Sequence, residues 1–255
     1  MLCLFNQILW NWLVSSLAVG ATLVLFDGNP FYPNAEMLLT MADELDITIF
    51  GTSAKYIATL KDVGVAPKTL SSFPKLKLIT STGSALADES FDYVYEEWKS
   101  DVLLASISGG TDIISCFVLG SPTLGVYRGE IQCSGLGMDV DCFDGNGHSI
   151  VDQQGELVCK SAFPSMPIYF WNDPDGKKYR RAYFETFPGI WHHGDYIRIS
   201  GHGGITVFGR SDATLNPAGV RIGTAEIYRI VESMEEVSDS VAVGQKYQGD
   251  ERIIL

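Results

Sequence analysis

Strand-like and helix-like segments alternate through the first part of the chain, and this alternation constrains the fold most. Apolar residues recur with helical spacing over Ala35–Leu45 and Thr52–Asp62, and short apolar runs lie at Ile47–Phe50, Leu76–Thr80 and Val102–Ala105. Interleaved helices and buried strands are typical of a mostly parallel sheet covered by helices. We therefore predict an α/β body whose ligands bind at the carboxyl ends of the strands.

After Gly129 the pattern changes to short strands separated by hairpin turns such as Asp144–Gly147 and Gln153–Gly155. The strands expected here are Glu130–Cys133, Met138–Phe143, His148–Val151 and Glu156–Lys160. We expect three parts: an α/β part over residues 1–128, a β-rich subdomain over 129–211, and the start of a small C-terminal α+β lobe over 212–255.

Charge and cysteine content narrow the class of protein. The 255 residues carry a net charge of −13, which argues against non-specific nucleic-acid binding because phosphates need a basic surface. The five cysteines are odd in number and form no CxxC pair, so a disulfide framework or a zinc knuckle is disfavoured. Reduced thiols and a cytoplasmic (cytosolic) location are expected.

The first 26 residues carry no charged side chain, which leaves a membrane span and a buried core segment as alternatives. No basic region precedes the apolar run, as a signal peptide would require. The run is also interrupted by the polar residues Asn6, Gln7, Asn11, Ser15 and Ser16. We favour a buried helix over Ile8–Ala18 and a buried strand over Thr22–Phe26, with no membrane span.

A first candidate ligand loop follows the strand Leu76–Thr80. It contains Gly83, Ser84 and Ala85 and leads into a helix expected over Asp88–Trp98. A glycine-containing loop between a strand and a helix is where α/β sheets bind ligands. The alternative is an ordinary connection without a ligand.

A second candidate loop follows Val102–Ala105. Its glycines, Gly109 and Gly110, would let the backbone approach a ligand closely. Thr111 offers a hydroxyl to a phosphate oxygen, and Asp112 offers a hard oxygen ligand to Mg²⁺. A Gly-Gly turn capped by Thr111 and Asp112 remains the alternative.

A third candidate region, Gly203–Tyr228, combines a strand, polar residues and a turn. Arg210, Ser211 and Asp212 follow the strand directly, and a turn at Asn216–Gly219 precedes Arg221 and a helix that Thr224 can cap. It predicts an anion-binding hinge, or, as the alternative, a strand, a turn and a helix with exposed polar residues. Upstream, Asp195 precedes the strand Tyr196–Ile199 and can accept hydrogen bonds from ribose hydroxyls, or be a surface acid.

The motif GRSDATLNPAGVRIGTAEIY at residues 209–228 resembles the hinge motif of the AMP-forming acyl-CoA synthetases. Similarity to one member of this family extends from about Trp10 over nearly the whole chain, most clearly in WNWLVSSLAVGATLVLFDGNP, SISGGTDIISCF and FPSMPIYFWNDPDG. The resemblance implies a ligase that uses ATP, CoA and Mg²⁺. It would join a carboxylic acid to CoA through an acyl-adenylate, with release of AMP and pyrophosphate.

The resemblance also implies a role for each candidate residue. Gly83, Ser84 and Ala85 would lie along the adenine and the acyl pocket. Thr111, beside Gly110, would contact the phosphates, and Asp112 would lie near the metal, although many relatives carry the longer Glu at that position. The remaining roles are Asp195 on the ribose, Arg210 on the ribose or phosphate, Asp212 as the hinge pivot, Gly219 along the pantetheine path and Arg221 in phosphate binding.

Two parts of the family pattern are not found in the sequence: a Gly/Ser/Thr-rich phosphate loop ending in Lys, and a downstream Gly-Lys segment. We expect the chain to be part of a longer enzyme and to be inactive alone. A non-catalytic nucleotide- or protein-binding module and a ligase for another short carboxylic acid are the alternatives. No nucleic-acid partner is expected, only small-molecule substrates.

Two other segments carry clustered ionisable side chains. The neighbouring His192 and His193 suggest zinc, but adjacent residues of a strand point to opposite sides, so they are not expected to chelate together. The basic run Lys177–Arg181 is interpreted as a solvated face, with a weak contact to CoA phosphates as the alternative.

Overall fold

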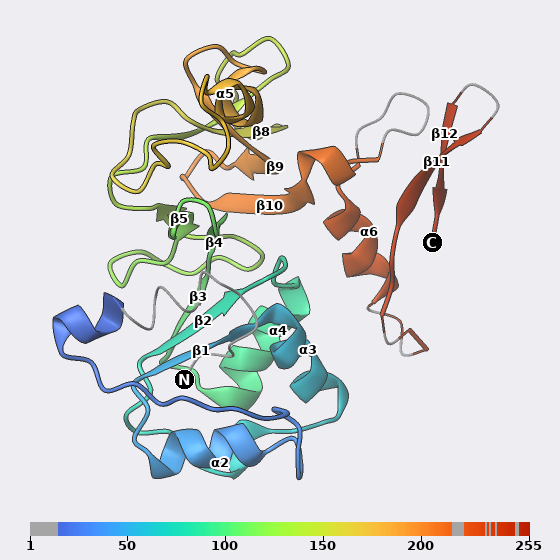
Figure 1. Cartoon of the computed structure of the whole chain (residues 1–255). Helices are drawn as coiled ribbons and strands as arrows, with labels where there is room; N and C mark the ends of the chain where they lie inside the picture. Colours follow the sequence, from blue (N-terminus) through green and yellow to red (C-terminus); the bar gives the residue numbers. More distant parts are fainter. Residues whose placement is uncertain (1–14, 216–221, 233, 235, 238, 248–249) are drawn as a thin grey trace. The chain divides into compact units, whose positions relative to one another are not determined.

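The computed structural model describes residues 15–255 except 216–221, 233, 235, 238 and 248–249 (Figure 1). The chain forms two compact units, Met1–Gly135 and Leu136–Leu255. The predicted three-part division, with boundaries after residues 128 and 211, stays a prediction.

The first unit contains the predicted parallel sheet. Its strands, in the order β1-β2-β3, are β1 (Ile49–Ser53), β2 (Leu78–Thr82) and β3 (Leu103–Ser106). Among the described residues of this unit, the helical segments with defined bounds are η1 (Leu17–Val19), α2 (Met37–Glu44), α3 (Ala54–Asp62), η2 (Pro67–Thr69), α4 (Asp88–Tyr93) and the π-helical turn η3 (Val94–Trp98). Parallel strands interleaved with helices confirm the predicted α/β class (Figure 1).

One hydrophobic core joins this sheet to its helices. Phe50, Ile79 and Leu104 come from the three strands, and each is at most 1% exposed. The indole of Trp98 meets the ring of Phe50 edge-on, with 5.4 Å between centroids. Burying one such large side chain stabilises the fold by about 1.5–3 kcal/mol. The backbone N–H of Tyr56 donates to the Ser53 hydroxyl at 3.1 Å, which caps α3 where the strand ends.

A second, antiparallel sheet completes the first unit. It consists of β4 (Ser108–Gly110), β5 (Ser115–Leu119) and β6 (Cys133–Ser134). Gly109 lies so close to β5 that a Cβ built on it would be 2.1 Å from the carbonyl oxygen of Ser115. The absence of a side chain at Gly109 is therefore required by strand packing, a reason that the sequence pattern did not indicate.

Replacing Gly109 with Ala is expected to destabilise the chain by about 2–3 kcal/mol, because the new methyl group would overlap a backbone atom that cannot move aside alone. Gly145→Ala is the matched control, since nothing lies within 4 Å of the Cβ position there, and it should change stability by less than about 0.5 kcal/mol. Urea unfolding of both variants measures the difference. Equal losses of stability in the two variants would show that the close approach of Gly109 to β5 does not affect stability.

The second unit is built on a four-stranded antiparallel sheet, which agrees with the predicted β-rich character. Its order is β10-β9-β8-β7, with β7 (Val140–Phe143), β8 (Gln154–Cys159), β9 (Trp191–Ile199) and β10 (Ile205–Arg210). The predicted strand His148–Val151 is wrong: it contributes only an isolated bridge between Ser149 and Phe143. The Cys142 thiol is buried in this sheet, and burial raises its pKa to about 12, so it stays protonated at neutral pH.

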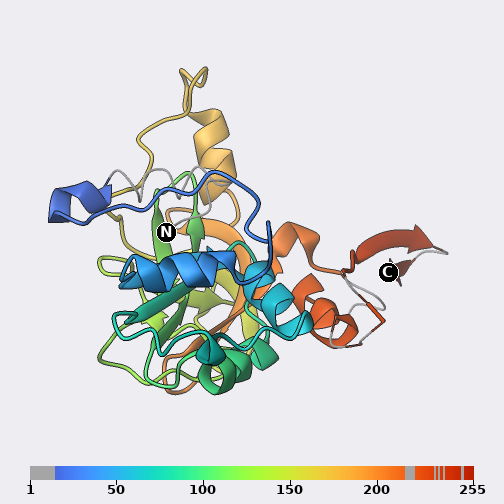
Figure 2. The ribbon, with the colours of Figure 1, turned by 90° about the horizontal axis from the view of Figure 1, so that it is seen from below.

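Helix α5 (Lys177–Phe184) was not predicted. The Asp173 carboxylate accepts hydrogen bonds from the backbone N–H groups of Lys178 at 3.0 Å and Tyr179 at 2.9 Å, which satisfies the first turn. The ring of Tyr183 stacks on Trp191 of β9, with centroids 3.7 Å apart. Figure 2 shows the loop before α5 projecting away from the sheet of this unit. Capping and aromatic packing together therefore fold the basic run into a helix.

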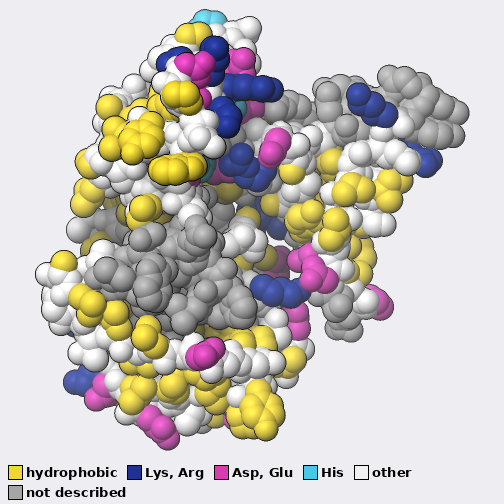
Figure 3. Space-filling view, viewed as in Figure 1, with side chains coloured by type: hydrophobic (Ala, Val, Ile, Leu, Met, Phe, Trp, Pro, Cys, Tyr) yellow, Lys and Arg dark blue, Asp and Glu magenta, His cyan; other side chains and the backbone are white. Residues whose placement is uncertain are grey.

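The cations of α5 lie beside acidic side chains on the surface. Lys177 Nζ is 2.7 Å from the Asp175 carboxylate, and Arg181 Nε is 3.7 Å from that of Glu185. The Lys177 and Arg181 side chains are 80% and 82% exposed. Figure 3 shows such dark blue and magenta side chains together in the upper part of the molecule. The arrangement agrees with the predicted solvated face, because both cations are largely exposed to solvent. Exposed ion pairs of this kind contribute little to stability.

In the described part of the chain after β10, a turn, a helix and a hairpin follow. They are the 3₁₀ turn η4 (Ser211–Ala213), helix α6 (Thr224–Val231), and an antiparallel hairpin of β11 (Val243–Tyr247) and β12 (Asp250–Ile254). The predicted helical cap at Thr224 is shifted by one residue, because Gly223 is the N-cap. Its backbone N–H donates to the Glu226 carboxylate at 2.9 Å.

The apolar start of the chain differs from its prediction. Thr22–Phe26 is not a strand and is not buried; Leu25 is 62% exposed, and only this residue of the five has a bridge partner. An apolar run makes a strand only where a neighbouring strand supplies a hydrogen-bonded ladder. Most of the predicted helix Ile8–Ala18 lies outside the described residues. Within residues 15–255, apart from the stated gaps, no helix is both long and apolar enough to cross a bilayer.

Candidate functional site

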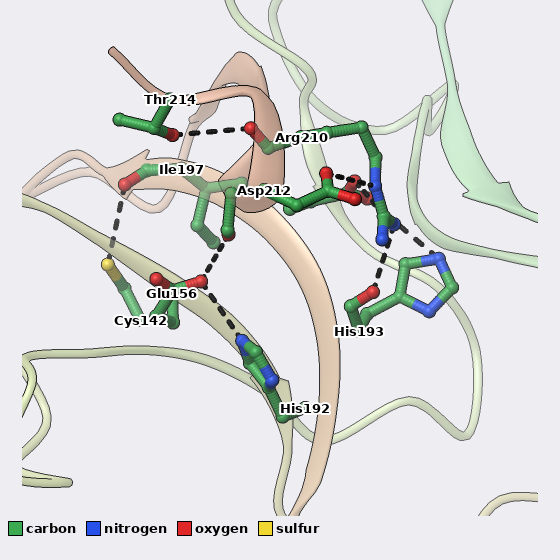
Figure 4. Close-up of polar contacts among 10 residues, drawn as sticks. Cys142, Glu156, His192, His193, Ile197, Arg210, Asp212 and Thr214 are labelled. Carbon is green, nitrogen blue, oxygen red and sulfur yellow. Dashed lines mark hydrogen bonds and ion pairs between the residues drawn. The ribbon is translucent and has the colours of Figure 1, made fainter. Parts of the chain in front are cut away.

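Arg210 and Asp195 face each other across two neighbouring strands of the second unit. They are paired in register at the end of β10 and in the middle of β9. The guanidinium Nη1 donates to the carbonyl oxygen of His193 at 3.0 Å and to Asp195 Oδ1 at 3.3 Å (Figure 4). Two acceptors of β9, the His193 carbonyl oxygen and the Asp195 carboxylate, therefore hold the same nitrogen of the cation.

The same guanidinium reaches the linker, which is the segment of residues 211–223 between β10 and α6. Its Nε lies 3.5 Å from Asp212 Oδ1. The side chain of Asp195 is 10% exposed, that of Arg210 is 52% exposed, and that of Asp212 is 79% exposed. The structure thus brings the predicted residues Arg210, Asp195 and Asp212 together, ordered from the sheet outward. A guanidinium held this way presents N–H groups toward solvent, where an anion can bind.

Gly194 makes room for this arrangement. Its φ of +81° is a backbone conformation that other residues rarely adopt, and a Cβ built on it would lie 2.8 Å from Arg210 Nη2. The glycine between His193 and Asp195 therefore lets the guanidinium approach the backbone of β9 closely.

A second polar cluster, not anticipated from the sequence, lies next to the first. Glu156 of β8 is only 7% exposed, and its Oε2 is 3.0 Å from Nε2 of His192. The hydroxyl of Ser211 donates to the same oxygen (Figure 4). A charged residue inside the apolar strand segment GELVC was the available signal, since a buried carboxylate requires partners.

The two histidines of β9 have different partners. His192 pairs with Glu156, whereas Nε2 of His193 is 3.9 Å from Asp195 Oδ2. The two imidazoles thus have separate carboxylate neighbours, as neighbouring strand residues on opposite faces of a sheet do. Among the described residues, no group of three or more His, Cys, Asp or Glu side chains could hold a metal ion.

The linker after Asp212 is closed by a backbone pair. Leu215 and Ile222 exchange two hydrogen bonds, of 2.9 and 2.8 Å, in an isolated antiparallel bridge. The candidate residues Gly219 and Arg221 lie between them, outside the described residues. Beyond the bridge, Gln154 of β8 donates to Glu226 of α6 at 3.3 Å.

The remaining candidates belong to the first unit. Gly83, with a φ of +93°, Ser84 and Ala85 follow β2, and Gly110, Thr111 and Asp112 lie at the end of β4 and in the turn after it. Strands β2 and β3 are parallel neighbours, so their carboxyl ends meet at one edge of the sheet.

Polar groups line that edge. The backbone N–H of Ile107 donates to the carbonyl oxygen of Ser81 at 2.9 Å, which joins the two strand ends. The Ser81 hydroxyl is fully buried and has no hydrogen-bond partner among the described atoms. Thr111 and Asp112 are exposed. Gly83, Ser84 and Ala85 thus follow a strand of the parallel sheet, whereas Thr111 and Asp112 follow β4 of the antiparallel sheet.

Comparisons with solved structures define the fold. An anthranilate CoA ligase, AuaEII, solved with anthranoyl-AMP, superimposes with a TM-score of 0.75 over 92% of this chain at 19% identity. A benzoate CoA ligase from Burkholderia xenovorans LB400 gives a TM-score of 0.72 over 93% at 21% identity. At these identities the likeness shows the fold alone, which is that of the CoA ligases. No protein-family model matches the chain.

The particular relatives are acetoacetyl-CoA synthetases. That of Rhizobium meliloti (strain 1021) is 56% identical over 247 residues, and that of Danio rerio is 53% identical over 249, each match covering 97% of this chain. The structure of the Streptomyces lividans enzyme matches 94% of this chain with a TM-score of 0.87 and 42% identity. Sequence and fold together confirm the resemblance to the AMP-forming acyl-CoA synthetases. The chain spans 37–38% of the length of these relatives.

Proposed function

We propose that the chain forms the nucleotide-binding and hinge segment of an acetoacetate–CoA ligase. The identity of 50–56% to acetoacetyl-CoA synthetases over 97% of the chain carries this proposal. The cluster of Arg210, Asp195 and Asp212 supports it, because a cation beside two carboxylates suits a sugar phosphate. In such a ligase, acetoacetate attacks the α-phosphate of ATP to give an acyl-adenylate and pyrophosphate. The CoA thiol then attacks the acyl carbon and releases AMP.

In this proposal the second unit holds the ribose and the reacting phosphate. Asp195 accepts hydrogen bonds from the ribose hydroxyls, and its carboxylate is already oriented by Arg210 and His193. Arg210 stabilises negative charge on the phosphate with guanidinium N–H groups that are fixed before the ligand arrives. Asp212 acts as the hinge pivot. Gly219 would line the pantetheine path and Arg221 would support phosphate binding.

In the first unit, Gly83, Ser84 and Ala85 lie along the adenine and the acyl group, and Gly110 precedes the phosphate contact. Thr111 donates its hydroxyl to a phosphate oxygen. Mg²⁺ in such enzymes is held by one or two carboxylates together with substrate phosphates, and the exposed Asp112 fits that donor set. A bound Mg²⁺ would neutralise charge on the phosphates. The proposed partners are small molecules, and the proposed location is the cytosol.

Calorimetry of the 255-residue chain with AMP, ATP and CoA tests the nucleotide-binding part of this proposal. We expect AMP to bind, and Asp195→Asn to weaken AMP binding by about tenfold or more, because the charged acceptor of the ribose hydroxyls is lost. Asp62→Asn, at a 62% exposed surface position, is the control and should leave the affinity unchanged. Binding of AMP that is indifferent to Asp195 would refute the ribose role, and turnover by the chain alone would refute its assignment as one segment of the enzyme.

A further inference from the structure

Glu156 has no role in the proposed ligand contacts, yet it is one of the few buried carboxylates of the second unit. Its side chain is 10% exposed. Removing a carboxylate from water is costly unless hydrogen bonds compensate for the lost hydration. The contacts that compensate here lead to the linker, because Ser211 donates to the same oxygen that His192 approaches.

Ser211 is placed so that its bond to Glu156 affects two candidate residues. It lies between Arg210 and Asp212 and begins the turn η4. The turn is also held by the Thr214 hydroxyl, which donates to the carbonyl oxygen of Arg210 at 3.2 Å (Figure 4). The bond from Ser211 to Glu156 thus ties this turn to β8, a strand two places away from β10 in the sheet.

A second contact of β8 lies at the far end of the same linker. Gln154, two residues before Glu156, points to the same face of the strand and donates to Glu226 in the first turn of α6. Glu226 also accepts the N–H of Gly223, the residue directly after the Leu215–Ile222 bridge. One face of β8 therefore contacts the linker where it leaves β10 and where it enters α6.

We propose that Glu156 and Gln154 are positioning residues, which fix the linker between β10 and α6 and thereby the direction of Arg210 and Asp212. The importance of this direction for a ligand rests on the proposed function. The fixing of the linker does not, and it can be measured without any ligand.

Hydrogen exchange of the full chain measures the fixing. In Glu156→Ala we expect the Thr214 and Leu215 amides to exchange about tenfold faster or more, because the turn has lost its tie to the sheet. Ser211→Ala removes the same bond from the other side and should give the same local increase. The amides of Ile197 and Val207, in the ladder between β9 and β10, should keep their rates in both variants. Loss of exchange protection throughout the sheet in both variants, or no change in the turn, would overturn the proposal.

The conservative variant Glu156→Gln separates positioning from general stability. Its amide oxygen can accept the same bonds from Ser211 and His192, so exchange in the turn should return to within about threefold of the parent rate. AMP calorimetry on the same variants separates the two proposals. Absence of AMP binding in the parent chain and in every variant would refute the nucleotide site and leave the positioning role standing. Unchanged exchange with intact AMP binding would refute the positioning role alone.

Discussion

Arg210→Ala is expected to lower acetoacetate-dependent pyrophosphate release by about 100- to 1000-fold, which is the usual loss when one fixed donor to a charged transition state is removed. The measurement uses a chimera in which this chain replaces the matching segment of the Rhizobium meliloti relative, with which it shares 56% identity. The expected loss is large because the guanidinium is oriented in advance by Asp195 and the His193 carbonyl.

Arg181→Ala is the matched control for this experiment. Its guanidinium is 82% exposed on α5, pairs with Glu185, and has no proposed part in the adenylation step. Pyrophosphate release should be unchanged in this variant. A loss of less than about threefold in Arg210→Ala would show that the cation does not act in adenylation. If the chimera were active with other short carboxylic acids but not with acetoacetate, the proposed substrate would be wrong and another short acid would take its place.

Trp191→Ala is expected to destabilise the second unit by about 3–5 kcal/mol, as is usual for removal of a buried aromatic side chain. The indole is 1% exposed and lies between Tyr183, at a centroid distance of 3.7 Å, and Phe163, at 5.2 Å. It starts β9, four residues before Asp195, so its loss removes support from the strand that carries the ribose candidate.

Urea unfolding followed by near-ultraviolet circular dichroism measures this loss. Trp171→Ala is the control, because that indole is 89% exposed and should contribute less than about 0.5 kcal/mol. If the two tryptophan variants unfolded at the same urea concentration, the aromatic cluster would not be a source of stability.

The α/β part was predictable because local patterns and tertiary structure agree there. The helical spacing before Asp62 and the apolar run at Leu76–Thr80 became α3 and β2 with shifts of about two residues. Helix α5 was missed because its charges were interpreted as a solvated face, whereas the stacking of Tyr183 on Trp191 that supports it is a tertiary contact. The cap from Asp173 is local, and its position before the basic run was the signal available in the sequence. The pattern at Thr22–Phe26 failed for the converse reason, since apolar residues alone do not supply a partner strand.

The candidate site likewise has residues that the sequence indicated and one that it did not. Arg210 and Asp212 were found because they lie in one continuous motif. Asp195 was found as a carboxylate directly before the predicted strand Tyr196–Ile199, which in the structure begins earlier, at Trp191. Glu156 was missed since 55 positions separate it from Ser211, and the two meet only because β8 pairs with β9 and β9 pairs with β10. Contacts of this range come from strand register, which one sequence does not reveal.

The irregularity in β10 has a consequence for how this site was assembled. Pairing with β9 is offset between Val207 and Gly209, so Phe208 is an extra residue on one side, and Arg210 rather than Gly209 stands opposite Asp195. Side chains alternate between the two faces of a sheet. The face from which Arg210 projects therefore depends on whether the number of residues before it in β10 is odd or even. A chain shortened by one residue here could keep every functional group and still aim its positive charge at the wrong face.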